Sequence, residues 1–279
     1  MLGRFGLLFA CVLGLGCAPA TDTPVPAPPP SSPRTVIDEV EAPAQSVAPA
    51  EAEGPAEADP SVGAPVTGTP AVAPEWVSQE INEHYAQNDN PKRWAKRFER
   101  IGREVFDQRD PIVAALGLRK GQRIADVGAG TGLFTMELAR AVGEQGTVYA
   151  VDVQPYFLDH IAQRARKEGL SNVKLVRARQ DSVQLPEGSV QLVLMCDAYH
   201  HVEQPAAYLE SLRRAIEPGG RLVVVDYRAV EGENRAWIVE HVRATPEQFR
   251  AEIEGAGFRF VREHEGVLEE NFFYEFERP

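Results

Sequence analysis

The sequence predicts an α/β protein with a seven-stranded sheet, helices on both faces and an antiparallel last strand. From residue 76 onward, short apolar runs alternate with longer stretches whose apolar residues recur at helical spacing, as in a parallel sheet. The run 122–127 passes directly into a glycine-rich loop and then into a helical pattern. The last two runs, 258–263 and 270–276, are joined by a short turn, which favours an antiparallel pair at the end of the sheet.

The elements follow one another in a regular order along this part of the chain. We expect strands near residues 122–127, 147–152, 173–177, 191–196, 221–226, 258–263 and 270–276. Helices are expected over residues 78–88, 91–107, 110–117, 132–142, 155–168, 205–216 and 245–255. The clearest helix start is Thr245, a capping residue followed by a proline in the first turn and then by an acid.

Residues 1–17 have the composition of a signal peptide. Arg4 supplies a positive charge, and Phe5–Leu15 is an apolar run that is too short to span a bilayer as a helix. The run ends close to Cys17, whose surroundings resemble a bacterial lipobox, and we expect this cysteine to carry a lipid. Cleavage without a lipid at Ala18–Ala20 is the alternative.

Residues 18–75 have the composition of a disordered tether. They contain 14 of the 22 prolines, nine acids, one base and no aromatic residue. Such a segment cannot bury enough apolar surface to offset the entropy of ordering. We therefore expect a lipoprotein of the bacterial cell envelope, held on the membrane by Cys17, with a soluble periplasmic or secreted form as the alternative.

The remaining residues, 76–279, are about the length of one domain. Their 27 bases and 32 acids give a net charge of −5, which does not indicate nucleic-acid binding. Basic residues between 93 and 103 alternate with apolar ones at helical spacing, so we expect helix 91–107 to have a solvated basic face. Cys196 is the one cysteine of this part, which excludes a disulfide framework within it.

A glycine loop stands between the first strand and the following helix. It contains Gly128, Gly130 and Gly132, with Asp126 two residues before the first glycine. Glycines at this spacing allow positive φ angles and let a ligand approach the backbone. The dinucleotide fingerprint Gly-x-Gly-x-x-Gly lacks that acid, so an NAD-binding oxidoreductase is disfavoured. The loop resembles motif I of the class I S-adenosylmethionine (SAM) methyltransferases.

Three further stretches resemble the same family, in the same order, across residues 120–228. Asp152 ends the second strand about 20 residues after the loop, Asp181 and Ser182 precede a Leu-Pro pair, and residues 218–220 are Pro-Gly-Gly before the fifth strand. The resemblance implies a Rossmann-like sheet and SAM as cofactor. It assigns the methionine part to Asp126 and the three glycines, the ribose to Asp152, and the adenine to Asp181 and Ser182.

Candidate substrate-facing residues follow the fourth strand, where open α/β sheets place their ligands. They are Tyr199, His200 and His201, and imidazole suits proton transfer near neutral pH. At least one of the adjacent histidines is expected to be a packing or capping residue. We expect no metal site from Cys196, Asp197 and the two histidines, since consecutive residues rarely converge on one ion.

The loop after this strand also excludes two groups of enzymes. It has neither the Asn/Asp-Pro-Pro-Tyr/Phe sequence of exocyclic-amine methyltransferases nor the Pro-Cys pair of cytosine-C5 enzymes. Together with residues 237–244 and 269–273, it resembles a group of bacterial methyltransferase-like proteins over residues 90–278. His241 and Arg243 lie where relatives often build a substrate lid, although a polar helix face explains them equally well.

The sequence therefore predicts a SAM-dependent methyltransferase acting on a small-molecule or lipid- or quinone-like acceptor. Its rivals are a non-catalytic envelope protein that keeps the fold, because SAM is made in the cytosol, and an NAD-binding oxidoreductase. The oligomeric state and the acceptor atom are not specified by these motifs.

Overall fold

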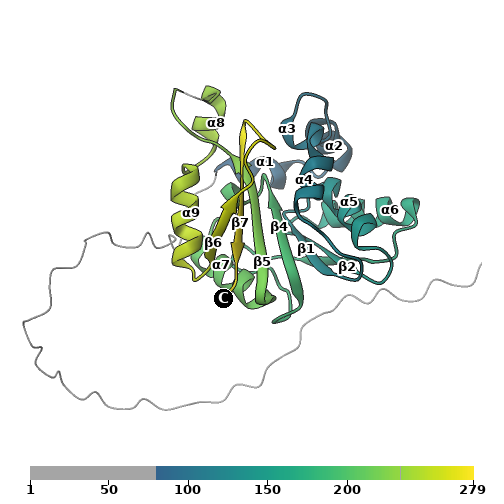
Figure 1. The fold of residues 1–279 in the computed structure, drawn as a ribbon. Coiled ribbons are helices and arrows are strands. Elements are labelled where there is room, and N and C mark those ends of the chain that lie inside the picture. The colour runs from purple at the N-terminus through teal and green to yellow at the C-terminus, as the bar shows by residue number, and fades with distance from the viewer. Residues whose placement is uncertain (1–79, 233) are drawn as a thin grey trace, which may run out of the picture. The chain divides into compact units, whose positions relative to one another are not determined.

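The computed structural model describes residues 80–232 and 234–279, which form an α/β domain (Figure 1). The predicted signal peptide, Cys17 and the tether lie outside the described residues. The helices are η1 (Glu80–Asn82), α1 (Glu83–Gln87), α2 (Pro91–Phe98), α3 (Glu104–Asp107), α4 (Arg109–Ala115), α5 (Leu133–Val142), α6 (Pro155–Glu168), η2 (Tyr199–His201), α7 (Pro205–Ala215), α8 (Ala236–His241) and α9 (Pro246–Gly255). The strands are β1 (Arg123–Val127), β2 (Thr147–Asp152), β3 (Val173–Arg177), β4 (Val190–Cys196), β5 (Ile216–Tyr227), β6 (Arg259–Glu263) and β7 (Asn271–Glu277).

The seven strands form one sheet in the order β3-β2-β1-β4-β5-β7-β6. Strands β1 to β5 pair in parallel, whereas β7 runs antiparallel to both β5 and β6. The predicted seven-stranded Rossmann-like sheet with an antiparallel last strand is confirmed. The chain order reverses between β1 and β4, so a crevice is expected beyond their carboxyl ends.

Alternate side chains of the central strands face two separate cores. Ile124, Val148 and Leu192 pack with α4 and α5 on one face, while Ala125, Val193 and Val224 belong to the core that includes α7 and α9. This alternation follows from the two-residue period of a strand, and it explains why the central strands are apolar throughout. Figure 1 shows the two groups of helices on opposite faces of the sheet.

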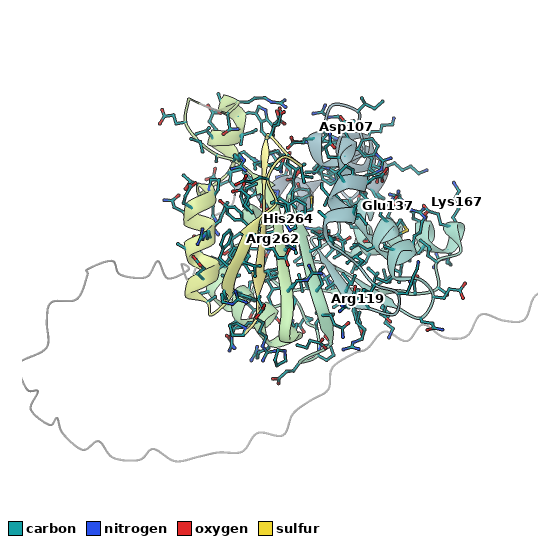
Figure 2. The ribbon with its side chains drawn as sticks, in the orientation of Figure 1. Asp107, Arg119, Glu137, Lys167, Arg262 and His264 are labelled. Atoms are coloured by element: carbon teal, nitrogen blue, oxygen red, sulfur yellow. The ribbon has the colours of Figure 1, made fainter. Side chains whose placement is uncertain are left out.

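The antiparallel edge of the sheet is held by a buried acid. Glu275 on β7 accepts hydrogen bonds from Arg262 at 2.8 Å and from Arg221 at 3.1 Å, and His264 Nε2 lies 2.9 Å from it (Figure 2). Burial acts to raise the pKa of this carboxyl, but the hydrogen bonds outweigh burial and lower the pKa. These contacts connect β5, β6 and β7 on the side of the sheet remote from β3.

The expectation of one continuous helix over residues 91–107 is wrong. Helix α2 ends at Phe98, the backbone turns at Gly102 with a φ of +85°, and the four-residue α3 follows. The turn redirects Arg103, which is largely buried and donates a 2.6 Å hydrogen bond to Asp197 after β4. Arg103 is therefore not part of a solvated basic face.

Glu104 of α3 also makes long-range hydrogen bonds. Glu104 accepts the backbone N–H groups of residues 269, 270 and 271 at 2.5, 3.0 and 2.9 Å, and so caps the start of β7. Helix α8, which the sequence did not predict, follows β5. In the described part of the chain, no helix has both the length and the apolar character needed to cross a membrane.

Replacing Arg103 by Met should destabilise the fold, because Asp197 would be left as a buried carboxylate without its cation. We expect a loss of about 3 kcal/mol in the free energy of unfolding, measured by urea denaturation. The exposed Arg93→Met, in the same basic segment, is the control and should change stability by less than about 0.5 kcal/mol. Equal effects of the two substitutions would contradict the buried pair.

Candidate active site

One cavity of about 610 Å³ lies at the crevice beyond the carboxyl ends of β1 and β4. Its walls come from the glycine loop, the ends of β1, β2 and β4, the segment of residues 81–104, and α8. Figure 1 shows α8 and the helices α2 and α3 at the same end of the sheet. The cavity therefore brings the predicted cofactor loop and the residues after β4 into one space.

The glycine loop is packed so closely that two of its glycines have no room for a side chain. A Cβ on Gly128, whose φ is +74°, would lie 2.5 Å from the Cβ of Ala198. A Cβ on Gly132 would lie 2.8 Å from Cγ1 of Ile161 on α6. Gly130 differs, because the nearest atoms to a Cβ there would be those of the Phe98 ring, at 3.6 Å, which is an ordinary contact distance. The backbone at Gly128 and Gly130 thus forms part of the cavity wall.

Two buried acids stand beside this loop. Asp126 Oδ2 accepts a 2.5 Å hydrogen bond from the Thr135 hydroxyl, and Asp152 accepts the N–H groups of Gly130 and Gln154, both at 2.8 Å. Burial raises the pKa of Asp126 to about 7, against the effect of the Thr135 hydrogen bond. Burial also raises the pKa of Asp152 to about 6, although backbone hydrogen bonds oppose it. No cation among the described residues pairs with either acid, so a cationic ligand would be favoured here.

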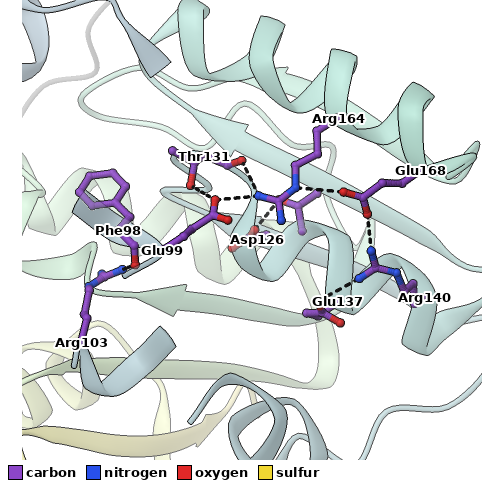
Figure 3. A network of polar contacts seen from close by, with 10 residues as sticks. Phe98, Glu99, Arg103, Asp126, Thr131, Glu137, Arg140, Arg164 and Glu168 are labelled. Atoms are coloured by element: carbon purple, nitrogen blue, oxygen red, sulfur yellow. Dashed lines mark hydrogen bonds and ion pairs between the residues drawn. The ribbon is translucent and has the colours of Figure 1, made fainter. Parts of the chain in front are cut away.

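A polar network holds α2 and α6 against the glycine loop (Figure 3). Glu99 Oε1 accepts hydrogen bonds from the Thr131 hydroxyl and from Arg164, both at 2.7 Å. Arg164 also donates to Glu168 at 3.2 Å, and Glu168 pairs with Arg140 of α5. The network therefore fixes the end of α2 over the loop.

Aromatic rings from the N-terminal helices form an apolar part of the wall. Tyr85 stacks on Trp94 with ring centroids 4.7 Å apart, and Trp94 stacks on Phe98 at 5.5 Å. Phe157 of α6 meets Phe98 at 6.3 Å. All four rings line the cavity. They offer a flat, water-excluding surface for an adenine or an aromatic acceptor.

His200 lies at the cavity with one ring nitrogen free. Its Nδ1 is 2.6 Å from Asp226 Oδ1 at the end of β5, so Nδ1 carries the proton and donates it to the carboxylate. Its Nε2 is buried without a hydrogen-bond partner, in a side chain that is 1% exposed. His200 is one of the residues that line the cavity, so this unpartnered nitrogen belongs to the cavity wall.

His201 also lies in the cavity wall, and its partner is Asn82 of the N-terminal segment. Its Nδ1 donates to Asn82 Oδ1 at 2.8 Å, while the Asn82 amide donates to the His201 carbonyl at 2.9 Å and to Glu203 at 2.8 Å. The Tyr85 hydroxyl is 3.5 Å from Nε2 of His201. Burial, followed by repulsion from His200, lowers the pKa of His201 well below its usual value, so the ring is neutral at pH 7.

Tyr199 is not a cavity residue, and its predicted acid–base role is corrected here. The side chain is fully buried in the core, its ring lies 5.1 Å from that of Phe249, and its hydroxyl donates to Glu252 at 3.0 Å. Glu252 is also bonded to Arg243 at 2.7 Å, which places Arg243 in the same core network and outside the cavity. Adjacent residues of a 3-10 helix point in different directions, and only the two histidines face the ligand space.

His241 of α8 completes a cluster with the two adjacent histidines. One nitrogen of each of the three rings lies within 4.8 Å of the others. Burial, followed by repulsion from His200, lowers the pKa of His241 to about 4. The sequence argument against a metal considered neighbouring residues alone. The structure adds a third histidine, from a segment some 40 residues away, to the residues that this argument considered.

The adenine prediction does not match the cavity wall. Asp181 is exposed, and the Ser182 hydroxyl accepts a hydrogen bond from the backbone of Gln184 at 3.2 Å. Neither residue lines the cavity, whereas the preceding residue, Gln180, does. The predicted stretch of the chain does reach the cavity, but through Gln180, one position before Asp181.

Several site residues were missed from the sequence. Asp226 ends the expected strand 221–226 but was given no role, and Asn82 and Tyr85 precede the motifs altogether. Asp197 has a φ of +46°, an unusual conformation for aspartate, and accepts hydrogen bonds from Arg103 and Asn271, both at 2.6 Å. An acid at the carboxyl end of a central strand was the one signal that could have identified Asp226.

Comparison with known proteins agrees with this geometry. Residues 124–220 match the family described as a methyltransferase domain. The ubiquinone/menaquinone biosynthesis C-methyltransferase UbiE of Yersinia enterocolitica is 32% identical over 112 residues, which are 40% of this chain and 45% of that protein. The chain thus spans less than half the length of the curated relatives that it matches.

Solved structures share the fold. A SAM-dependent methyltransferase from Aquifex aeolicus has a TM-score of 0.61 and 28% identity, over 68% of this chain and 99% of that one. The [4+2]-cyclase SpnF has a TM-score of 0.56 and 22% identity, over 70% of this chain and 77% of that one, which shows the fold alone. Residues 124–220 are thus similar to a methyltransferase domain, and the described residues share their fold with a SAM-dependent methyltransferase of known structure.

The raised pKa of Asp126 predicts how stability varies with pH. The folded pKa of about 7 exceeds the unfolded value of about 3.9, so the stability that this carboxyl contributes is complete below pH 4 and is lost as pH rises through 7. Asp126→Asn keeps the acceptor for Thr135 and removes the titration. Between pH 5 and pH 8 we expect this variant to gain about 2 kcal/mol relative to the unsubstituted protein in urea unfolding.

The control for this titration is Asp159→Asn, at an exposed position on α6. The free energy of unfolding of this variant should differ from that of the unsubstituted protein by the same amount at pH 5 and at pH 8. A constant difference for Asp126→Asn as well would contradict the raised pKa.

Proposed function

We propose that this chain is a SAM-dependent methyltransferase whose acceptor is a small, apolar or lipid-like molecule of the quinone type. The observation that carries the proposal is the single cavity that connects the glycine loop to His200 and His201. A methyltransferase needs such a connection, because the methyl group passes in line from the sulfonium to a nucleophile held a few ångströms away.

The residues of the cavity fit SAM. The open backbone of Gly130 and the unpaired acid Asp126 suit the methionine part with its positive charges, and Asp152 has lone pairs left for the ribose hydroxyls. When bound, SAM supplies a methyl group activated by a sulfonium. The protein would hold this methyl group in place. Phe98 and the α2 segment above the loop would exclude water from it.

The acceptor side is apolar with a few polar groups. Trp94 and Phe157 supply flat walls, and His200 Nε2 is the lone pair available to accept a proton from a nucleophile. Trp237, 44% exposed, lines the cavity, and Ile101, 88% exposed, lies between two lining residues. Exposed apolar side chains beside the opening suit a lipid-like molecule, and the similarity to UbiE supports a quinone-type ring.

A second candidate function is binding or chemistry without methyl transfer. SpnF, which has the same fold, is described as a [4+2]-cyclase, so the fold alone does not determine the reaction. A non-catalytic envelope protein would keep the fold and the packing of Gly128. It would not need the open space at the backbone of Gly130. Ligand binding therefore separates this candidate from an enzyme.

Calorimetric titration of the full chain should show one saturable site for SAM and for its demethylated product. Asp152→Asn should weaken both ligands about tenfold or more, since one charge-assisted hydrogen bond to the ribose is lost. Labelled methyl transfer from SAM to a panel of hydroquinones then tests the acceptor class.

Asp159→Asn is again the matched control and should bind as the unsubstituted protein does. If a folded chain binds neither ligand, the methyltransferase proposal is wrong. If it binds SAM but methylates no hydroquinone, the quinone-type acceptor is wrong and the cofactor assignment stands.

We further propose that the chain is a lipoprotein of the bacterial cell envelope. The support is the sequence around Cys17 and the proline-rich stretch that follows it. Two acyl chains hold a protein far more firmly than one, because each buried CH₂ contributes about 0.8 kcal/mol. The domain would then act near the membrane, where quinone-type molecules dissolve.

Cys17→Ala should move the protein from the membrane fraction to the soluble fraction when the full chain is produced in a bacterium, because the acylated thiol is lost. Immunoblotting of the separated fractions measures this. Cys11→Ala is the matched control and should stay with the membranes. A Cys17→Ala protein that remains membrane-bound would exclude the lipid anchor.

A further inference from the structure

The three histidines of the cavity come from two separate segments. His200 and His201 form most of η2 after β4, and His241 ends α8 after β5. The ring centroids of His200 and His201 are 4.0 Å apart, and that of His241 lies 5.2 Å from the first and 5.5 Å from the second. Methyl transfer to a carbon or oxygen acceptor does not by itself require three imidazoles at one point.

Each of the two adjacent rings is oriented from behind by an oxygen acceptor. Asp226 Oδ1 holds Nδ1 of His200 at 2.6 Å, and Asn82 Oδ1 holds Nδ1 of His201 at 2.8 Å. Each ring thus presents Nδ1 to an oxygen acceptor; Nε2 of His200 has no partner, and Nε2 of His201 lies 3.5 Å from the Tyr85 hydroxyl. This is the arrangement in which metal-ligating histidines are found, since an outer carboxylate or carbonyl fixes the tautomer and the direction of the ring.

The orphaned Nε2 of His200 is the second observation. A histidine that only packs in a core satisfies both of its nitrogens, whereas this atom is buried and has no partner. The Asp226 carboxyl lies directly behind the cluster, 2.6 Å from Nδ1 of His200.

We propose that His200, His201 and His241 form a binding site for one divalent transition metal ion of the zinc type. Three imidazoles with one position left open are a ligand set found in catalytic zinc sites. Ligand atoms at about 2.0–2.1 Å from a tetrahedral ion lie about 3.4 Å apart. The present nitrogens, within 4.8 Å of one another, would approach by a small movement of the His241 side chain on the six-residue α8.

The open position of such an ion would face the cavity. A hydroxyl, phenolate, carboxylate or thiol of a bound molecule could occupy it, because these groups supply the oxygen or sulfur that zinc accepts as a further ligand. The ion would then take the lone pair of His200 and lower the pKa of the coordinated group in place of a free imidazole base. The metal site does not depend on the SAM assignment, because the glycine loop contributes nothing to it.

Titration of the chelator-treated full chain with Zn²⁺ and with Co²⁺ tests the site. We expect one equivalent to bind, with the intense visible absorption of four-coordinate Co²⁺ and displacement by Zn²⁺. His241→Gln should weaken Zn²⁺ binding at least 100-fold, and Asp226→Asn should weaken it 10- to 100-fold through the orientation of His200. Thermal unfolding of each metal-free variant checks that it is folded.

His160→Gln is the matched control, since this histidine lies on α6 outside the cavity. It should bind Zn²⁺ as the unsubstituted chain does. The proposal is overturned if the chain binds no Zn²⁺, or if His241→Gln and Asp226→Asn, both folded, bind it unchanged. The second result would place the metal outside the histidine cluster.

Discussion

The site depends on the close approach of the glycine loop to the segment that follows β4. Gly128 lies so near Ala198 that no side chain fits between them, and Tyr199 alone separates Ala198 from His200. The parallel pairing of β1 and β4 sets this approach, because both strands end at the same edge of the sheet. The loop and the histidines therefore share one cavity as a result of backbone packing.

The N-terminal helices form one wall of this crevice. Glu99 bonds to the glycine loop, Arg103 to Asp197, and Glu104 to the first residues of β7. Asn82 forms a hydrogen bond with His201. All four are long-range polar contacts, and they join the N-terminal segment to the glycine loop after β1, to the segment after β4 and to the start of β7.

The sequence was most informative where one local pattern determines the structure. The strands and Asp126 were predictable, because apolar periodicity and glycine spacing depend on nearby residues. Arg103 was not, since its helical pattern was overridden by a turn at Gly102 and by a partner 94 residues away. Tyr199 and His200 look equivalent in the sequence, and only the tight 3-10 turn directs one to the core and the other to the cavity. The place of His241 in the site could not be predicted, because it depends on where α8 folds back.

The contacts of Asn82 bear on what constitutes the functional unit of this protein. The matched methyltransferase family begins at residue 124, after the whole of the N-terminal wall. A histidine of the site is nevertheless oriented by an amide 42 positions upstream of that boundary. The matched region and the site therefore have different limits, and substitutions in the upstream segment can reshape the cavity wall while the strands and the glycine loop keep their fold.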